Sequence, residues 1–479
     1  MRLKSYIFMI FIIAMIVFPF LLSSGTDEIS YAFMDVKLVA MTSDIVLDQQ
    51  TVIIKGSEII TIGPSDQVQM PDNSIIIDGE GFYLMPGLAD MHMHTREDWD
   101  DPNVWPVHPL SLYLANGVTT VRDFGPSGIK ITYPFLWRDE ISAGLRVGPR
   151  IFTSGKLLYA SPLEDPEEIV QMNADLGFDF IKFYSYLSED DFLRGIQQAK
   201  LLGIYTAGHI PFAVGLNGVL ESGMDEIAHV EELLFEFFDF NRQQDLTPDE
   251  WWAEIKAGVV NSLDIDDEDF LDHFFQANAP LLENISNRLV DSKTPLDTTM
   301  IVDRVVLQKN FQRGIFLEKS ENRYFKKGYL EGYLAGDEKH LNQCRGVEAF
   351  CAAKEEIDSW ILRGLHEAGV LLVLGTDAGT GGMGIVPGFS VHEELGILVE
   401  NGFSPYQALR TTTVNAAKAA ERMTGEGDFG TIEAGNKADL LLVEENPLEN
   451  LDALRDPVGV MAAGRWYTKE SLHRLLESD

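Results

Sequence analysis

Basic residues are scarce in this sequence: 37 Lys and Arg stand against 75 Asp and Glu, and the formal net charge is −38. No run of Lys or Arg offsets this acidic excess. Because affinity for nucleic acids comes largely from cationic contacts to phosphates, the composition argues against a polyanionic partner. It indicates a solvated acidic surface, whose negative field would favour the collection of metal cations.

Cysteine is also scarce, with only Cys344 and Cys351, in the stretch CRGVEAFC. A disulfide between them is plausible in an oxidising compartment. A continuous helix over this stretch would separate the two Cα atoms by about 10.5 Å, beyond the usual reach of a disulfide. The two residues can therefore form a bridge only if the segment bends.

A long apolar run lies at residues 6–22, after Arg2 and Lys4 and before the small residues at 23–25. This pattern predicts an export signal over residues 1–25. Its length lies between that of the apolar core of a signal peptide and that of a spanning helix, so cleavage and retention as a membrane anchor both remain open; Pro19 and the small residues after it favour cleavage. In either case we expect the rest of the chain to be delivered across the membrane, to a periplasmic or extracellular location.

The 479 residues exceed the usual size of one domain, and their patterning changes along the chain. Short β-branched runs at residues 31–83 predict an antiparallel meander; they read VKLVA, TVIIKG, EIITIG and SIIIDG. A second β-rich stretch, with GTIEAGNKADLLLVE and VGVMAAGRWY, lies near the other end. Between them, strand-like runs alternate with amphipathic helices, which predicts parallel strands; eight such units close into a barrel.

One interval, between His229 and Leu374, is longer than one or two βα units require. Residues 235–285 within it are acidic and aromatic, and we expect an inserted helical subdomain there. Such an insertion either covers a barrel edge or forms a lid over a pocket. The lid is the favoured interpretation, because loops at the carboxyl ends of barrel strands face the active site.

Two histidines end the stretch LMPGLADMHMH at residues 84–94. In a strand the side chains of residues i and i+2 point to the same side, so His92 and His94 would project together and could hold one metal ion. Two surface imidazoles are the alternative, and the pair alone does not decide between them.

Further polar residues follow strand-like runs, at the place where a barrel presents catalytic groups. They are Lys182 in DFIKFYS, His209 in YTAGHIP, His229 in EIAHVEE and Asp377 in LLVLGTDAG. Any one of them could be a core histidine or a turn residue. Their occurrence together, in strand order, favours one shared site.

This order of His-x-His, Lys, His, His and Asp resembles the amidohydrolase superfamily, in the branch of imidazolonepropionase-like and metal-dependent prolidase-like proteins. The motifs LMPGLADMHMH, GVTTVRDFG, GPRI, GTDAG and GTIEAGNKADLLLVEENP add to the resemblance, which runs from about residue 32 to 467. It implies an α/β fold: a (β/α)8 TIM-like barrel over residues 84–429, and a small composite β-sandwich assembled from residues 31–83 and 430–470.

Carried over position by position, the resemblance implies that His92, His94 and Asp377 bind one metal ion and that His209 and His229 bind a second, both expected to be Zn²⁺. Two such ions would supply a bridging hydroxide at neutral pH and polarise a substrate carbonyl. Asp377 would then take up the hydroxide proton and deliver it to the leaving nitrogen, as a general base and acid.

Lys182, carboxylated by CO2, would bridge the two ions, because a carbamate is an oxygen donor whereas an ammonium group cannot be a ligand. The alternative is a buried lysine paired with a carboxylate in a single-metal enzyme. Mononuclear deaminases of this superfamily carry His-x-x-Glu at the fifth strand, and here the stretch is His209-Ile-Pro-Phe212. Deamination is therefore the less favoured reaction.

The sequence also departs from the dipeptidase members, with Pro211 in place of a tyrosine and KFYSYLS after the lysine position. Tyr184 and Arg122 are the nearest polar candidates for substrate contact, although Arg122 and Asp123 are more readily explained as a structural pair. The sequence thus predicts an exported metal-dependent hydrolase of C–N bonds in small amides, peptides or cyclic amides. The alternatives are a deaminase and an inactive barrel scaffold, which would be expected to have lost ligands.

Overall fold

The computed structural model describes residues 29–126, 128, 130–242, 246–262, 269–337, 341, 344 and 347–477. The apolar run at residues 6–22 lies outside these ranges, so the expected export signal over residues 1–25 stays a prediction. Within the described ranges, no helix combines the length and the apolar character needed to cross a bilayer.

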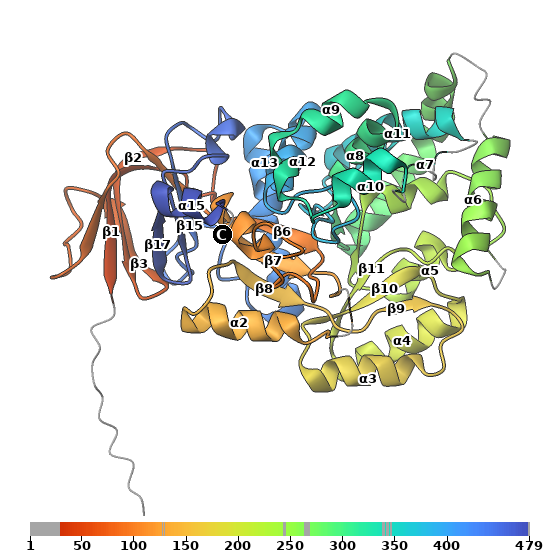
Figure 1. Ribbon diagram of the computed structural model, residues 1–479, viewed down its shortest axis with the longest axis horizontal. Coiled ribbons are helices and arrows are strands. Elements are labelled where there is room, and N and C mark those ends of the chain that lie inside the picture. Colours follow the sequence, from red (N-terminus) through yellow and green to blue (C-terminus); the bar gives the residue numbers. More distant parts are fainter. Residues whose placement is uncertain are drawn as a thin grey trace, which may run out of the picture.

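An eight-stranded sheet joins the two ends of the described chain (Figure 1). Strand β5 (Tyr83–Pro86) pairs antiparallel with β15 (Leu440–Val443), which places Met85 opposite Leu441. Apolar side chains from both ends share one core, with Phe33 and Leu84 packed in the same cluster as Leu440. This sheet confirms the composite β domain of the predicted fold class. Its other strands are β1 (Ser30–Leu38), β2 (Leu47–Lys55), β3 (Glu58–Pro64), β4 (Ile75–Asp78), β16 (Gly459–Ala462) and β17 (Arg465–Thr468).

The predicted antiparallel meander is correct for β1, β2 and β3 but wrong for β4. Strand β4 runs parallel to β1, with Tyr31 opposite Ile75. The reason is the segment of residues 65–74, which carries the chain from β3 to the side of β1 that β2 leaves open. A connection of that length permits a parallel pairing that a tight hairpin would not.

The barrel consists of eight parallel strands. They fall into two groups that isolated bridges connect, from Ser154 to Phe180 and from Met93 to Ala378, and these bridges close the barrel. This confirms the predicted (β/α)8 barrel. The strands are β6 (Leu88–Met93), β7 (Val118–Asp123), β8 (Arg150–Thr153), β10 (Phe180–Tyr186), β11 (Tyr205–Gly208), β12 (Glu226–Ile227), β13 (Leu296–Asp297) and β14 (Leu372–Val373).

Helices follow the barrel strands, and α4 (Glu189–Leu202) shows how the sequence defines them. The Ser188 hydroxyl accepts a hydrogen bond from the backbone NH of Asp191, and Gly203 ends the helix in a left-handed conformation. Its apolar face, with Phe192, packs on the barrel. The other helices along the first part of the barrel are α1 (Pro109–Ala115), α2 (Tyr133–Ala143), α3 (Pro166–Leu176) and α5 (Gly215–Ser222).

The long interval after β12 contains a short 3-10 helix, η1 (Val230–Glu236), and then α6 (Pro248–Ser262) and α7 (Phe270–Ser292). Helix α7 packs against α11 (Glu348–Ala368) and returns the chain to β13. Between β13 and α11 lie α8 (Ile301–Phe311), α9 (Arg313–Glu318), η2 (Ser320–Tyr324) and α10 (Tyr329–Ala335). The chain after β14 forms α12 (Phe389–Glu400), α13 (Pro405–Thr412), α14 (Val414–Thr424), η4 (Leu451–Leu454) and α15 (Lys469–Leu475).

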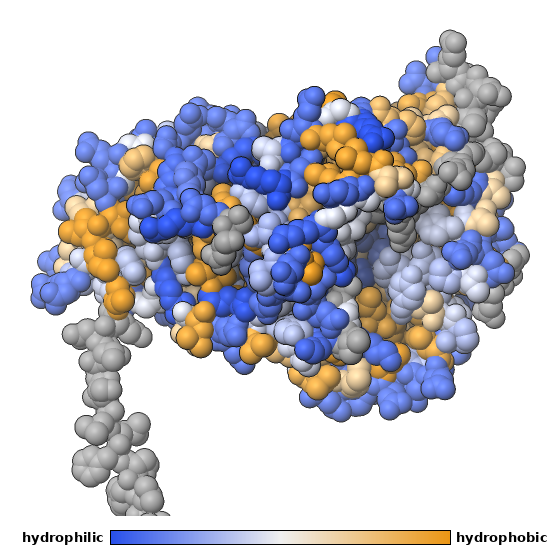
Figure 2. Space-filling view, in the orientation of Figure 1, coloured by the Kyte–Doolittle hydropathy of each residue, from blue (hydrophilic) through white to orange (hydrophobic). Residues whose placement is uncertain are grey.

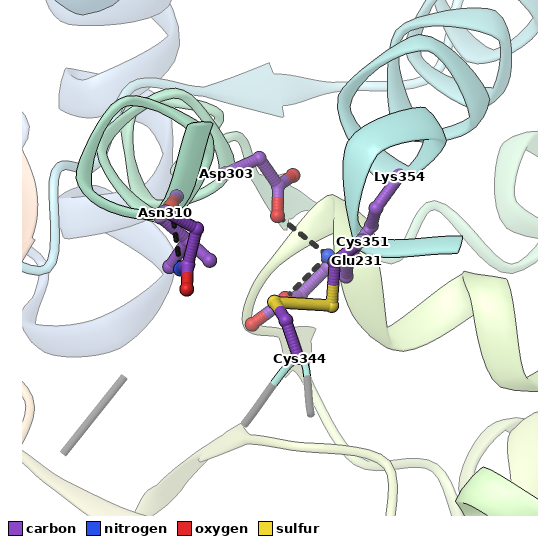
Figure 3. The surroundings of a disulfide bond; sticks show 7 residues. Glu231, Asp303, Asn310, Cys344, Cys351 and Lys354 are labelled. Atoms are coloured by element: carbon purple, nitrogen blue, oxygen red, sulfur yellow. Dashed lines mark hydrogen bonds and ion pairs between the residues drawn. A yellow bond between two sulfur atoms is a disulfide. The ribbon is translucent and has the colours of Figure 1, made fainter. Parts of the chain in front are cut away.

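Cys344 and Cys351 form a disulfide (Figure 3), with their Cα atoms 5.7 Å apart. The bend that the sequence required is present, because α11 begins at Glu348 and only Cys351 lies within it. One turn further along α11, the Lys354 ammonium lies 2.7 Å from Glu231 Oε2 in η1 and 2.5 Å from Asp303 Oδ1 in α8. These contacts tie α11 to the segment that directly follows His229.

Candidate functional site

Four histidines meet at one end of the barrel. His92 lies in β6, His94 directly follows that strand, His209 follows β11 and His229 follows β12. The ring centroids of His92 and His229 are 4.4 Å apart, and those of His209 and His229 are 4.6 Å apart. The expectation that strand-end histidines converge is therefore met by the geometry.

The first two histidines are oriented by hydrogen bonds at Nδ1. His92 Nδ1 donates to Asp297 Oδ2 at 2.8 Å, and His94 Nδ1 donates to the carbonyl of Gly125 at 3.1 Å. A proton on Nδ1 leaves the lone pair on Nε2, which is the usual arrangement of a histidine that binds a metal.

The other two histidines are held in the same way. His209 Nδ1 donates to Glu232 Oε1 at 2.5 Å, and His229 Nδ1 lies 2.8 Å from the Thr299 hydroxyl oxygen. His229 also has a φ of 65°, a left-handed conformation that few side chains adopt. Each of the four rings thus engages an oxygen through Nδ1, and this pattern is hard to explain as core packing alone.

Asp377 lies beside the first two histidines. Its Oδ1 is 2.9 Å from His94 Nε2 and 3.8 Å from His92 Nε2. Burial alone would raise the pKa of this carboxyl, but the hydrogen bond and charge of His94 hold the pKa below its ordinary value. A left-handed backbone, with φ at 57°, turns Asp377 toward the site after β14. The group is therefore positioned as an ionised carboxylate.

Lys182 is 1% exposed on β10, and its Nζ has no hydrogen-bond partner in the described part of the chain. Burial lowers the pKa of its ammonium to about 8, against the opposing charges of Asp297 and Asp377. The buried His92 Nε2 also has no hydrogen-bond partner there. Native proteins rarely leave such atoms unpaired, because each costs about 1–3 kcal/mol.

A divalent metal ion fits this donor set. The ligand atoms of His92, His94 and Asp377 all lie within 4.8 Å of one another, and imidazole nitrogens with a carboxylate oxygen are typical zinc ligands. The ligand atoms of a second trio, His92, His229 and Asp297, also lie within 4.8 Å of one another. Both Asp297 oxygens already accept hydrogen bonds, from His92 Nδ1 and from the backbone NH of His229, so Asp297 orients ligands in this arrangement.

The structure brings all six predicted site residues to the same end of the barrel. The sequence analysis did not identify the residues that orient them: Asp297, Glu232 and Thr299. A polar residue after a strand was the signal used for Asp377, but β13 is two residues long and its surroundings, TPLDTT, lack an apolar run. The sequence around Asp297 therefore lacks the apolar run that would have identified it as a residue at the end of a strand.

Arg122 is not a substrate contact, and its predicted pairing with Asp123 is wrong. The guanidinium is completely buried and forms a bidentate ion pair with Glu226, in which its NH1 lies 2.8 Å from Oε2. Asp123 instead accepts hydrogen bonds from the backbone NH and the hydroxyl of Thr95. Neighbours in a strand point to opposite faces, which separates the two side chains.

Comparisons with known proteins agree with this geometry. Residues 311–467 match the model of the amidohydrolase family. The chain is 23% identical over 412 residues to the ochratoxinase of Aspergillus niger, across 79% of this chain and 73% of that protein. The structure of a Xaa-Pro dipeptidase with bound methionine matches with a TM-score of 0.61 and 19% identity, over 92% of this chain and 100% of the other. The structure of molinate hydrolase matches with a TM-score of 0.62 and 17% identity, over 93% and 96% of the two chains.

Proposed function

We propose that this chain is an amidohydrolase that hydrolyses C–N bonds of small amides, peptides or cyclic amides at a centre of two divalent metal ions, on the family match over residues 311–467 and the similarity to ochratoxinase. The observation that carries the proposal is the set of four imidazoles that meet at one end of the barrel, each engaged by an oxygen at Nδ1. Relatives named for acting on ochratoxin, on dipeptides and on molinate support the reaction type and leave the substrate of this chain open.

The ligands divide into two groups in this proposal. His92, His94 and Asp377 would hold one ion, and His209 and His229 would hold the other. Bound there, such ions polarise a carbonyl and lower the pKa of a water molecule. Zinc is the metal we expect, since the donors are nitrogen and carboxylate oxygen.

Lys182 would carry a carbamate, which would supply oxygen donors to the ions. In the described part of the chain the buried Nζ has no hydrogen-bond partner as an amine, and the oxygens that CO2 would add are metal donors. Formation of the carbamate requires the neutral amine, and the burial of Lys182 favours that form.

Asp377 manages the proton in the proposed reaction. The oxygen of a water molecule adds to the amide carbon, the C–N bond breaks, and the products are a carboxylic acid, which keeps the second proton of the water, and an amine. Asp377 takes a proton from the water and delivers it to the leaving nitrogen. Its lowered pKa supplies the ionised form that the first of these transfers needs.

Export remains part of the proposal, on the pattern of residues 1–25 and on one further observation. The described chain has a disulfide and no free cysteine, and such bonds persist in oxidising compartments. Fractionation of the native host should place the protein outside the cytoplasm.

The first test is the metal stoichiometry. We expect about two zinc ions per chain by elemental analysis of protein produced with zinc, and loss of amide hydrolysis when a chelator removes them. Readdition of zinc should restore both the stoichiometry and the activity. A value of one ion per chain, together with an unmodified Lys182 amine, would establish the single-metal alternative, and release of ammonia from a heterocycle would establish deamination.

The second test concerns the carbamate. Lys182→Ala should lower metal occupancy and reduce turnover about 10- to 100-fold, because one bridging ligand is lost. A carbamate is a carboxylate, so added propionate should enter the vacated space and restore part of both quantities. Propylamine is the matched control, and it should restore nothing. Rescue by propylamine in place of propionate would show that Lys182 acts as an ammonium group.

A further inference from the structure

A row of aromatic side chains leads outward from the metal centre along β10. Lys182, Tyr184 and Tyr186 are spaced by two residues, so their side chains lie on one face of the strand. The Tyr184 ring lies 4.1 Å from the His209 ring, and the rings of Tyr184 and Tyr186 lie 5.5 Å apart. The row therefore starts in contact with a proposed ligand.

Two more aromatic residues extend this row toward solvent. Tyr159, in β9 (Leu158–Ala160), lies 4.8 Å from Tyr184 and is 46% exposed. Trp252, in α6, donates from Nε1 to the Tyr186 hydroxyl at 3.1 Å and is 37% exposed. We call these four residues the aromatic wall: Tyr159, Tyr184, Tyr186 and Trp252.

Two neighbouring tryptophans attach α6 to this part of the barrel. Trp251 is buried against Phe212, with ring centroids 5.4 Å apart, while the neighbouring Trp252 turns to Tyr186. The molecular surface is hollowed between its centre and the side that carries α6 (Figure 2). Tyr186 is buried and Tyr184 is partly exposed, whereas Tyr159 and Trp252 are exposed. Exposed aromatic rings are costly to hydrate, so these two rings beside the candidate site indicate a binding surface for an apolar group.

The charges near the aromatic wall indicate whether the apolar group that binds there can carry a charge. Asp249 lies close enough to raise the pKa of the Tyr159 hydroxyl, after burial as the larger cause. Arg242 is paired with Glu236, and Lys354 is paired with Glu231 and Asp303. A substrate carboxylate at the wall would therefore meet the negative charge of Asp249 and would not find a free cation in Arg242 or Lys354.

The two ends of the scissile bond can also be assigned. Asp377, which delivers the proton to the leaving nitrogen in the proposed function, contacts His94 and His92. Tyr184 contacts His209, on another strand. The leaving nitrogen thus belongs beside Asp377, and the acyl group belongs beside the aromatic wall.

We propose that the aromatic wall selects amides whose acyl side carries an uncharged aromatic ring, stacked against Tyr184 and Tyr159 and covered by Trp252. This inference rests on the proposed function. Offset stacking of one ring on another contributes about 0.5–1.5 kcal/mol beyond burial of area, which corresponds to a preference of about 3- to 10-fold over a saturated ring of the same size.

The test compares two amides of the same amine, one phenylacetyl and one cyclohexylacetyl, with the zinc-loaded protein. We expect kcat/KM to favour the phenylacetyl amide about 3- to 10-fold, mainly through KM. Tyr159→Ala and Trp252→Leu should each remove most of that preference at unchanged zinc content. Tyr406→Ala, a partly buried tyrosine on α13, is the matched control and should leave the preference intact.

Binding provides a readout that does not need turnover. Phenylacetone and cyclohexylacetone have no C–N bond and therefore cannot be hydrolysed as amides. We expect phenylacetone to quench the tryptophan fluorescence at a lower concentration than cyclohexylacetone. Trp252→Leu should abolish this difference. Selective binding without hydrolysis of either amide would overturn the proposed function and leave the aromatic wall standing. Hydrolysis of both amides at equal kcat/KM, or an equal loss on both in Tyr159→Ala, would overturn the aromatic wall.

Discussion

Asp377→Asn is expected to lower turnover by about 10²–10⁴-fold while the protein stays folded and zinc-replete, since this is the usual contribution of a general acid and base. The substitution keeps the size and one oxygen donor of the side chain. It removes the carboxylate that now lies 2.9 Å from His94 Nε2 and that can accept a proton. The measurement pairs kcat with bound zinc in the same preparation.

The control for this experiment is a ligand that has no proposed role in proton transfer. His94→Ala should lower zinc occupancy, and excess zinc should restore part of its activity, because the defect is in metal binding. Excess zinc should not restore Asp377→Asn. Near-normal turnover in zinc-replete Asp377→Asn would remove Asp377 from the mechanism and would weaken the whole assignment of the site.

The barrel and the convergence of the candidate site residues could be predicted from the sequence because their signals are local. His92 and His94 follow an apolar run, and Lys182 lies inside one, so each strand marks its own candidate residue. The composite sheet was predictable for a similar reason, since both chain ends are rich in β-branched runs. Local patterning sufficed wherever a strand lay within an apolar or β-branched run.

The missed features depend on contacts between distant segments. Strand β13 lies in TPLDTT, which has no apolar run, and its role comes from pairing with β12 and β14. Asp297 at its end reaches His92, 205 positions away in the sequence. The parallel pairing of β4 likewise depends on which side of β1 was still open. Sequence periodicity carries no information on such partners.

The ion pair of Arg122 and Glu226 is the clearest case of a long-range contact with a large expected effect. Both side chains are completely buried, the guanidinium lies over the Phe124 ring at 4.7 Å, and the Tyr205 hydroxyl donates to Glu226 at 2.9 Å. Glu226→Gln should lower the free energy of unfolding by about 3–5 kcal/mol, because it leaves a buried charge without its counter-ion. Urea denaturation at constant zinc measures this change. The matched control is Asp452→Asn, which breaks the exposed pair with Arg455 and should cost less than about 1 kcal/mol.

The double variant Arg122→Met/Glu226→Leu separates the stability of the barrel from the integrity of the site. Replacement of both charges by apolar groups of similar volume should restore most of the unfolding free energy, since the cost of the single variant comes from the unpaired charge. It should lower zinc affinity, because it also removes the 2.7 Å hydrogen bond from Arg122 Nε to the carbonyl of Met91, the residue before His92. We therefore expect a protein of near-normal stability with weakened zinc binding, measured by competition with a chelator. Unchanged zinc affinity in the double variant would show that Arg122 supports only the barrel, and that the position of His92 does not depend on it.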